Sequence, residues 1–124
     1  MISMPPFPES GNLFRDLPAQ RDAEHFDPLA VSAAVRIERI VSYGQASPPG
    51  FWYDQSEDEW VVVLQGEAEL ECLDPPEIIR LQSGDWLRIE AGRKHRVLKT
   101  SSQTPTIWLA VFYASPQILS SDVV

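Results

Sequence analysis

The sequence predicts an all-β domain of the sandwich or barrel type. Runs of β-branched and aromatic residues recur along the chain, and turn residues separate them at intervals of about ten positions. Helical periodicity is nearly missing, and no fixed repeat of the kind found in solenoids or propellers occurs. The 124 residues suffice for one domain with a buried core.

The first half of the chain predicts four extended segments. The first, VRIERIVSYG, begins at Val35 and alternates, with many β-branched residues. After the loop GQASPPG, the run FWYDQ is a short aromatic strand or the entry to a turn. Residues 59–65 predict a strand with apolar side chains on both faces, which Gly66 ends. Residues 67–73 alternate glutamates with apolar side chains, which is typical of a half-exposed strand.

The second half predicts four more strands joined by polar turns. They are expected at residues 78–81, 86–89, 95–99 and 106–113. The turn DPPE precedes the first of them, because proline cannot continue a strand ladder. QSGD and AGRK form the next two turns, and TSSQTP is a polar loop. The last strand, TIWLAVFY, is strongly apolar.

Three regions follow from this pattern. Residues 1–34 are expected to be an extended or partly helical N-terminal arm that packs on the barrel, since they are rich in proline and poor in periodicity. A short helical turn over residues 16–27 would end at Pro28. Residues 35–115 are the predicted β-barrel domain, and 116–124 a C-terminal tail.

Composition limits the classes of function. The formal net charge of -8 opposes contact with phosphate backbones and anionic lipid, so we expect neither a nucleic-acid nor a membrane partner. Cys72 is the only cysteine, which excludes an internal disulfide. The longest apolar stretch, residues 60–64, is too short to cross a bilayer, and no signal-peptide pattern opens the chain. We therefore expect a cytoplasmic protein.

Two spaced signatures carry the most specific information. Glu59 is followed at the seventh position by Gly66, and Gly84 opens GDWLRIEAGRKHRV with Gly92 and His95 at fixed steps beyond it. With these residues the chain resembles the cupin superfamily, whose members are small double-stranded β-helix (jelly-roll) barrels. The resemblance, closest to small bacterial single-domain cupins, implies a barrel whose interior holds a metal or a small ligand.

The chain departs from the cupin pattern where the metal ligands are expected. Counted back from Glu59, the two histidines of the first motif fall on Trp52 and Asp54 or on Tyr53 and Gln55, and neither pair contains histidine. In the second motif, proline and asparagine are replaced by Glu90 and Lys99. The ordinary set of three histidines and a glutamate is therefore incomplete.

The resemblance implies that Glu59 and His95 point into the barrel mouth from neighbouring strands. With an oxygen of Asp54 or Gln55 they would offer ligands for one divalent transition metal, Zn, Mn, Fe or Ni. The alternative is a hydrogen-bonded Glu59–His95 pair inside the barrel. Such a pair can serve as general acid and base, because histidine titrates near neutrality.

Three further side chains are candidate ligand contacts. Trp52 and Tyr53 occupy positions where the family places its metal ligands, so we expect them to line or plug the pocket. Arg88 would hold an anionic substrate if it pointed inward, whereas an outward arginine only extends along the surface. Cys72 alternates with glutamates and is expected to be a small buried residue, not a nucleophile.

Three functions remain open at this stage. The first is a cupin that binds an unknown small molecule, with little or no catalysis. The second is a metal-dependent dioxygenase, isomerase or lyase using His95, Glu59 and Asp54 or Gln55. The third is a structural or regulatory dimer with a filled barrel. The chain shows no P-loop, dinucleotide fingerprint, nucleophile elbow or CxxC pair.

Oligomeric state is predicted from the strand at residues 59–65. Trp60, Val62 and Leu64 give this strand a second apolar face. Such a face needs cover from the N-terminal arm or from another subunit, so we expect a homodimer.

Overall fold

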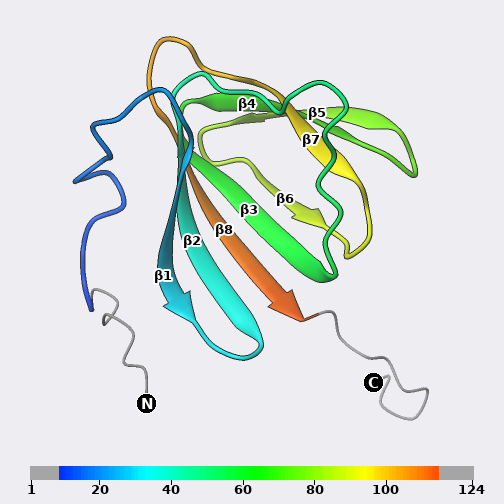
Figure 1. Ribbon diagram of the computed structural model, residues 1–124, viewed down its shortest axis with the longest axis horizontal. Coiled ribbons are helices and arrows are strands. Elements are labelled where there is room, and N and C mark those ends of the chain that lie inside the picture. The colour runs from blue at the N-terminus through cyan, green and yellow to red at the C-terminus, as the bar shows by residue number, and fades with distance from the viewer. Residues whose placement is uncertain (1–8, 115–124) are drawn as a thin grey trace.

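Eight β-strands make up the part of the chain that the computed structural model describes, residues 9–114 (Figure 1). No helix occurs within these residues, and thus none that could cross a membrane. The strands are β1 (His25–Val31), β2 (Val35–Ser42), β3 (Glu57–Gln65), β4 (Glu67–Cys72), β5 (Glu77–Gln82), β6 (Trp86–Ile89), β7 (His95–Thr100) and β8 (Thr106–Ala114). The predicted tail at 116–124 lies outside the described residues, as do residues 1–8 of the predicted arm.

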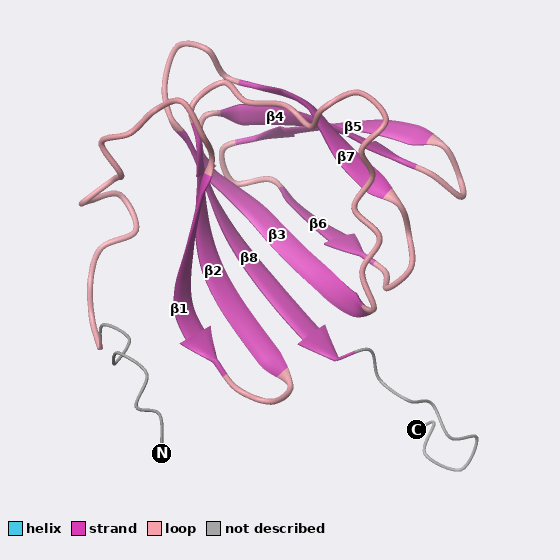
Figure 2. Cartoon of the chain, in the orientation of Figure 1, coloured by secondary structure: helices cyan, strands magenta, loops and turns pink. Residues whose placement is uncertain are grey.

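The strands form two antiparallel sheets that fold over one another as a jelly-roll barrel (Figures 1 and 2). The larger sheet has the order β1-β2-β8-β3-β6, and the smaller has the order β5-β4-β7. Neighbours such as β2 and β8 are far apart in sequence, so the chain crosses between the sheets. The all-β jelly-roll barrel predicted from the sequence is confirmed.

The core lies between the two sheets, because each strand turns alternate side chains inward. On β3, Val61 and Val63 are buried, whereas their neighbours Trp60 and Val62 are only partly buried. The buried cluster also draws on β4, β5, β6 and β8, so both sheets contribute to it. Its members are Val61, Val63, Ala68, Leu70, Leu81, Ile89, Trp108, Ala110 and Phe112.

The N-terminal region differs from its sequence-based description. Residues 25–31 form strand β1, which pairs with β2, so the helical turn expected to end at Pro28 is wrong in this stretch. β1 is an edge strand, where proline is tolerated because one side of the backbone has no ladder partner. The pairing register shifts between Pro28 and Ala30. The larger sheet therefore begins before the predicted barrel boundary at Val35.

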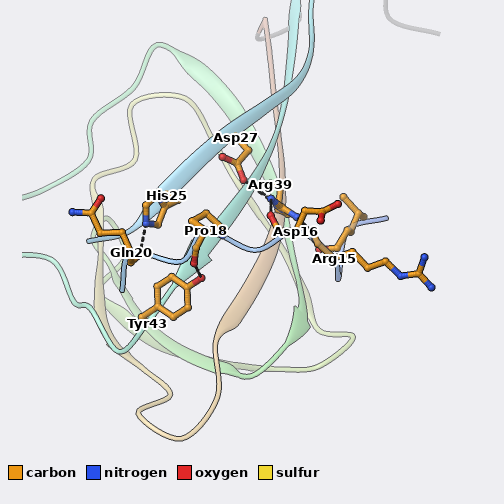
Figure 3. Close-up of polar contacts among 9 residues, drawn as sticks. Arg15, Asp16, Pro18, Gln20, His25, Asp27, Arg39 and Tyr43 are labelled. Atoms are coloured by element: carbon orange, nitrogen blue, oxygen red, sulfur yellow. Dashed lines mark hydrogen bonds and ion pairs between the residues drawn. The ribbon is translucent and has the colours of Figure 1, made fainter. Parts of the chain in front are cut away.

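Residues 9–24, which we call the N-terminal strap, are bound to the barrel through β1 and β2 (Figure 3). The Arg39 guanidinium donates to the carboxylate of Asp27 and to the backbone carbonyl of Arg15. The Tyr43 hydroxyl donates to the carbonyl of Pro18. These hydrogen bonds satisfy backbone carbonyls of the strap and fix its path along the barrel.

Gly66, in the turn between β3 and β4, cannot be replaced without strain. Its φ is 86°, in the left-handed region that favours glycine. A Cβ atom at this position would lie 2.8 Å from Cα of Thr106. This close approach of two backbones explains why the first signature needs glycine at this step.

Candidate functional site

A pocket lies between the two sheets of the barrel. Its walls come from β2, β3, β4, β7 and β8, from the loop before β3, and from the start of β1 together with the strap residue before it. The lining residues are Glu24, Phe26, Ile40, Tyr53, Gln55, Glu59, Val61, Leu70, His95, Val97, Trp108 and Phe112. Most of these side chains are aliphatic or aromatic, and the polar ones form a distinct minority.

Glu59 and His95 meet in this pocket from two different sheets. Glu59 lies on β3 in the larger sheet, and His95 begins β7 in the smaller sheet. The Nε2 atom of His95 is 3.4 Å from Oε1 of Glu59, and both side chains are buried. The Gln55 amide donates to the same Oε1 at 3.1 Å. The carboxylate is thus held by an amide and an imidazole.

The surroundings of His95 favour its protonated form. Nδ1 is 3.0 Å from the carbonyl oxygen of Arg93, and Nε2 faces the Glu59 carboxylate. A neutral imidazole has a single N–H, so one lone pair would point at an oxygen acceptor, whereas imidazolium donates to both. Burial lowers the pKa of His95, but these two hydrogen bonds and the charge of Glu59 together raise it above its usual 6.5.

Tyr53 lines the pocket beside His95. Its ring stacks on the His95 ring with centroids 5.3 Å apart, and Phe51 packs edge-on against it at 4.8 Å. The two backbones also pair, with the Tyr53 N–H donating to the His95 carbonyl at 2.8 Å. The pKa of Tyr53 is raised by burial and by the charges of Glu24 and Glu59. Two carboxylates therefore act on the same phenol.

The structure separates the two pairs that were alternatives for the first-motif positions. Tyr53 and Gln55 line the pocket, whereas Trp52 and Asp54 do not. Asp54 is exposed. Trp52 is half-buried, and the Arg96 guanidinium lies over its ring at 5.6 Å from the centroid.

Arg88 lies on the outer surface of the larger sheet. It pairs across the ladder with Trp60, whose side chain points away from the core. Its guanidinium is about half exposed and faces the carboxylates of Asp58 at 3.8 Å and Glu90 at 3.4 Å. The described pocket therefore does not include Arg88.

Sequence reasoning did not identify Glu24, Phe26, Ser42 or Trp108 as part of this region. Glu24 and Phe26 belong to the stretch expected to be an arm, and the pairing of β1 with β2 brings them to the pocket. Ser42 donates to the Glu24 carboxylate and accepts from the Trp108 indole at 3.1 Å. No spacing motif joins these residues, so only the strand register could reveal them.

The described residues do not form a complete transition-metal site. Between residues 9 and 114, no three His, Cys, Asp or Glu side chains gather closely enough to hold an ion. Catalytic zinc sites use about three protein ligands. Here the facing atoms of Glu59 and His95 bind each other, and Gln55 turns its amide donor toward Glu59. This arrangement suits an ion pair better than Zn, Mn, Fe or Ni.

The free space in the pocket is small. The cavity volume open to the centres of water molecules is about 60 Å³. One water molecule needs about 10–15 Å³ of this volume. The pocket therefore admits a few waters or a compact organic molecule unless side chains move.

Comparison with known proteins gives a consistent result for the barrel. The family model described as "Cupin domain" matches residues 40–112. A candidate mannose-6-phosphate isomerase from Ralstonia eutropha JMP134 is 47% identical and superposes with a TM-score of 0.83. The alignment covers 87% of this chain and 100% of that one. A search of curated protein sequences gave no match.

More distant structures share the architecture. A cupin superfamily protein from Desulfitobacterium hafniense DCB-2 has a TM-score of 0.70 at 19% identity, over 92% of this chain and 100% of that one. Hydroxypropylphosphonic acid epoxidase from S. wedmorenis has a TM-score of 0.63 at 16% identity, over 74% and 51% of the two chains. At such identities the similarity shows the fold alone.

Proposed function

This chain belongs to the cupin family, and from that premise we propose that its barrel binds a small organic molecule in the pocket beside Glu59 and His95. The proposal assigns binding as the primary role and no defined reaction. The cytoplasmic location and the absence of nucleic-acid and membrane partners remain predictions from the sequence.

The observation that carries the proposal is the division of the pocket lining. Apolar side chains from both sheets form the walls, and among them Gln55, Glu59 and His95 form one polar group in mutual contact. Small-molecule sites generally have this composition, with a few placed polar groups that orient an otherwise apolar contact. A barrel with a purely structural role would be expected to fill this space with side chains.

The Glu59–His95 pair gives the pocket a proton that can be shared with a ligand. Nε2 of His95 lies 3.4 Å from Oε1 of Glu59, and a ligand acceptor entering beside them would compete for a hydrogen on Nε2. A pair of this kind can support general acid–base chemistry if a substrate is held within hydrogen-bond distance. Binding by itself requires only that the pair orient the ligand.

A sugar phosphate would fit this pocket poorly, although the Ralstonia protein is described as a candidate mannose-6-phosphate isomerase. Within residues 9–114, the lining contains two glutamates and neither lysine nor arginine. Phosphate recognition normally uses arginine, lysine or backbone N–H groups. We therefore expect mannose 6-phosphate to bind weakly or not at all.

The second candidate is a metal-dependent dioxygenase, isomerase or lyase. The meeting of His95, Glu59 and Gln55 in one pocket favours it, since these residue types can ligate a divalent metal. For this function Gln55 would have to turn its amide oxygen inward and His95 would have to lose its proton. The metal would then act as a Lewis acid toward a bound substrate.

Analysis of protein purified without a histidine tag separates the two candidates. We expect less than stoichiometric transition metal by elemental analysis, and an organic molecule or none after denaturing extraction and mass spectrometry. Near-stoichiometric metal that is lost in Glu59→Ala and His95→Ala, with retention in the distant control Glu90→Ala, would overturn the binding proposal in favour of the enzyme.

A further inference from the structure

We propose that Glu24, carried into the pocket by the N-terminal strap, makes this site select a compact ammonium ligand over neutral or anionic molecules of the same size. The inference deepens the proposed function and rests on it, because it names the class of molecule that the pocket takes. It concerns a residue outside the region that the cupin model matches, residues 40–112.

The position of Glu24 is fixed by contacts on both sides of it in sequence. Before it, the strap is tied to the sheet by the Tyr43 hydroxyl, which donates to the Pro18 carbonyl, and by Gln45, whose amide donates to the Arg21 carbonyl at 3.0 Å. After it, His25 is the first residue of β1. Figure 3 shows the strap running beside Tyr43 and His25. Glu24 is therefore held at the pocket by the fold itself.

The charges that line the pocket do not balance. Glu59 faces His95, the one lining side chain of the described residues that can carry a compensating positive charge. Glu24 accepts only from the neutral Ser42 hydroxyl among the side-chain contacts of the described residues. The lining includes no lysine or arginine in the described part of the chain, so one carboxylate charge is left over. A ligand cation is the group that this charge would stabilise.

Aromatic rings form part of the remaining pocket wall. Phe26, Tyr53, Trp108 and Phe112 all line the pocket. An ammonium group is attracted to the faces of such rings, most strongly where water is excluded. The same rings provide apolar contact for the carbon skeleton of the ligand. The carboxylate and the aromatic rings thus favour the same kind of ligand, an amine with a compact hydrocarbon skeleton.

If Glu24 had a purely structural role, ligand binding would not depend on the charge at position 24. Ser42 needs an acceptor, and an amide oxygen at position 24 can replace the carboxylate in that contact. Glu24→Gln should therefore keep the strap in place and remove only the negative charge. If the glutamate served only to hold Ser42 and Trp108, this substitution would leave ligand selection unchanged.

The test compares three probes that share the cyclopentyl ring: cyclopentylamine, cyclopentanol and cyclopentanecarboxylate. Isothermal titration calorimetry at neutral pH would measure their dissociation constants for wild type, Glu24→Gln and the control Glu90→Gln. Glu90 is exposed and lies outside the pocket. Its variant changes the net charge by the same amount as Glu24→Gln. We expect the amine to bind wild type at least about tenfold more tightly than the alcohol, a difference of about 1.4 kcal/mol.

Glu24→Gln should weaken amine binding by about tenfold and leave alcohol binding unchanged, whereas Glu90→Gln should change neither. Retained alcohol binding shows that the variant is folded. Equal binding of amine and alcohol to wild type, or an equal effect of both substitutions, would overturn the selection of ammonium while leaving pocket binding in place. Failure of all three probes to bind would overturn both the inference and the proposed function.

Discussion

The two faces of the larger sheet use similar apolar side chains for different purposes. Along β3, Glu59, Val61 and Val63 are buried inside the barrel, while Trp60, Val62 and Leu64 remain partly exposed outside it. The inner face includes a buried carboxylate that is paired and hydrogen-bonded. On the outer face of this strand, Trp60, Val62 and Leu64 follow Asp58, whose carboxylate lies 3.8 Å from Arg88. Of the two buried carboxylates only Glu59 lines the pocket, so the inner face is the side where we expect ligand binding.

The outer face continues onto the neighbouring strands. Leu109 and Val111 on β8 lie opposite Val62 and Trp60 in the ladder, and Trp86 on β6 stacks on Trp60 with centroids 6.0 Å apart. Trp86 is 61% exposed. The N-terminal strap binds at β1 and β2, at the other end of the sheet. The apolar surface around β3 and β6 therefore lies outside the contacts described for the strap.

The largest expected effect is the difference in stability between losing a tryptophan of the inner face and losing one of the outer face. Trp108→Ala should destabilise the protein by about 3–5 kcal/mol, because it empties the inner core and leaves Ser42 without its indole donor. The control Trp86→Ala removes an exposed ring and should cost far less. Urea unfolding of both variants measures the difference, and equal losses of stability would contradict the assignment of inner and outer faces.

A smaller, pH-dependent effect is expected from the buried pair. Since the pKa of His95 is raised in the fold, its stabilising contribution is fully present below the ordinary value of 6.5 and is lost as pH rises through the folded pKa. The free energy of unfolding should therefore fall from weakly acidic to alkaline pH relative to His95→Gln. His25→Gln provides a second-histidine control at a residue that does not line the pocket. An identical pH dependence in His95→Gln and wild type would show that the pair does not hold its proton.

The outer face should affect assembly more than folding. We expect wild type to be a homodimer in light scattering coupled to size exclusion, and Trp86→Glu to be a monomer of nearly unchanged intrinsic stability. Replacing one of the two stacked indoles with a carboxylate would oppose a dry interface there. A wild-type monomer at micromolar concentration would make the dimer prediction wrong.

The sequence predicted the barrel because strand alternation and the signature glycines are local features. The resemblance to cupins also implied that Glu59 and His95 share one site, and the structure brings them to 3.4 Å. It could not choose between Trp52 with Asp54 and Tyr53 with Gln55, since one step along a strand reverses every side chain.

Glu24 and Phe26 could not be predicted as pocket residues. Their placement depends on β1 joining the sheet through β2, and the sequence of this stretch, with Pro28 at its centre, favours an arm over a strand. The Ser42–Trp108 hydrogen bond likewise joins residues 66 positions apart. Such contacts arise from strand register across the sheet, for which the local pattern provides no signal.

Backbone and indole ¹H–¹⁵N spectra would test most directly whether a ligand binds inside the barrel. The chain has four tryptophans, of which Trp108 lines the pocket, whereas Trp60 and Trp86 lie on the outer face of the larger sheet. Each indole signal would be assigned by a single Trp→Phe substitution, and cyclopentylamine and cyclopentanol would then be added. The account predicts that the Trp108 indole signal shifts on binding while those of Trp60 and Trp86 stay in place. Shifts confined to Trp60 and Trp86, with Trp108 unmoved, would place the ligand on the outer face and contradict it.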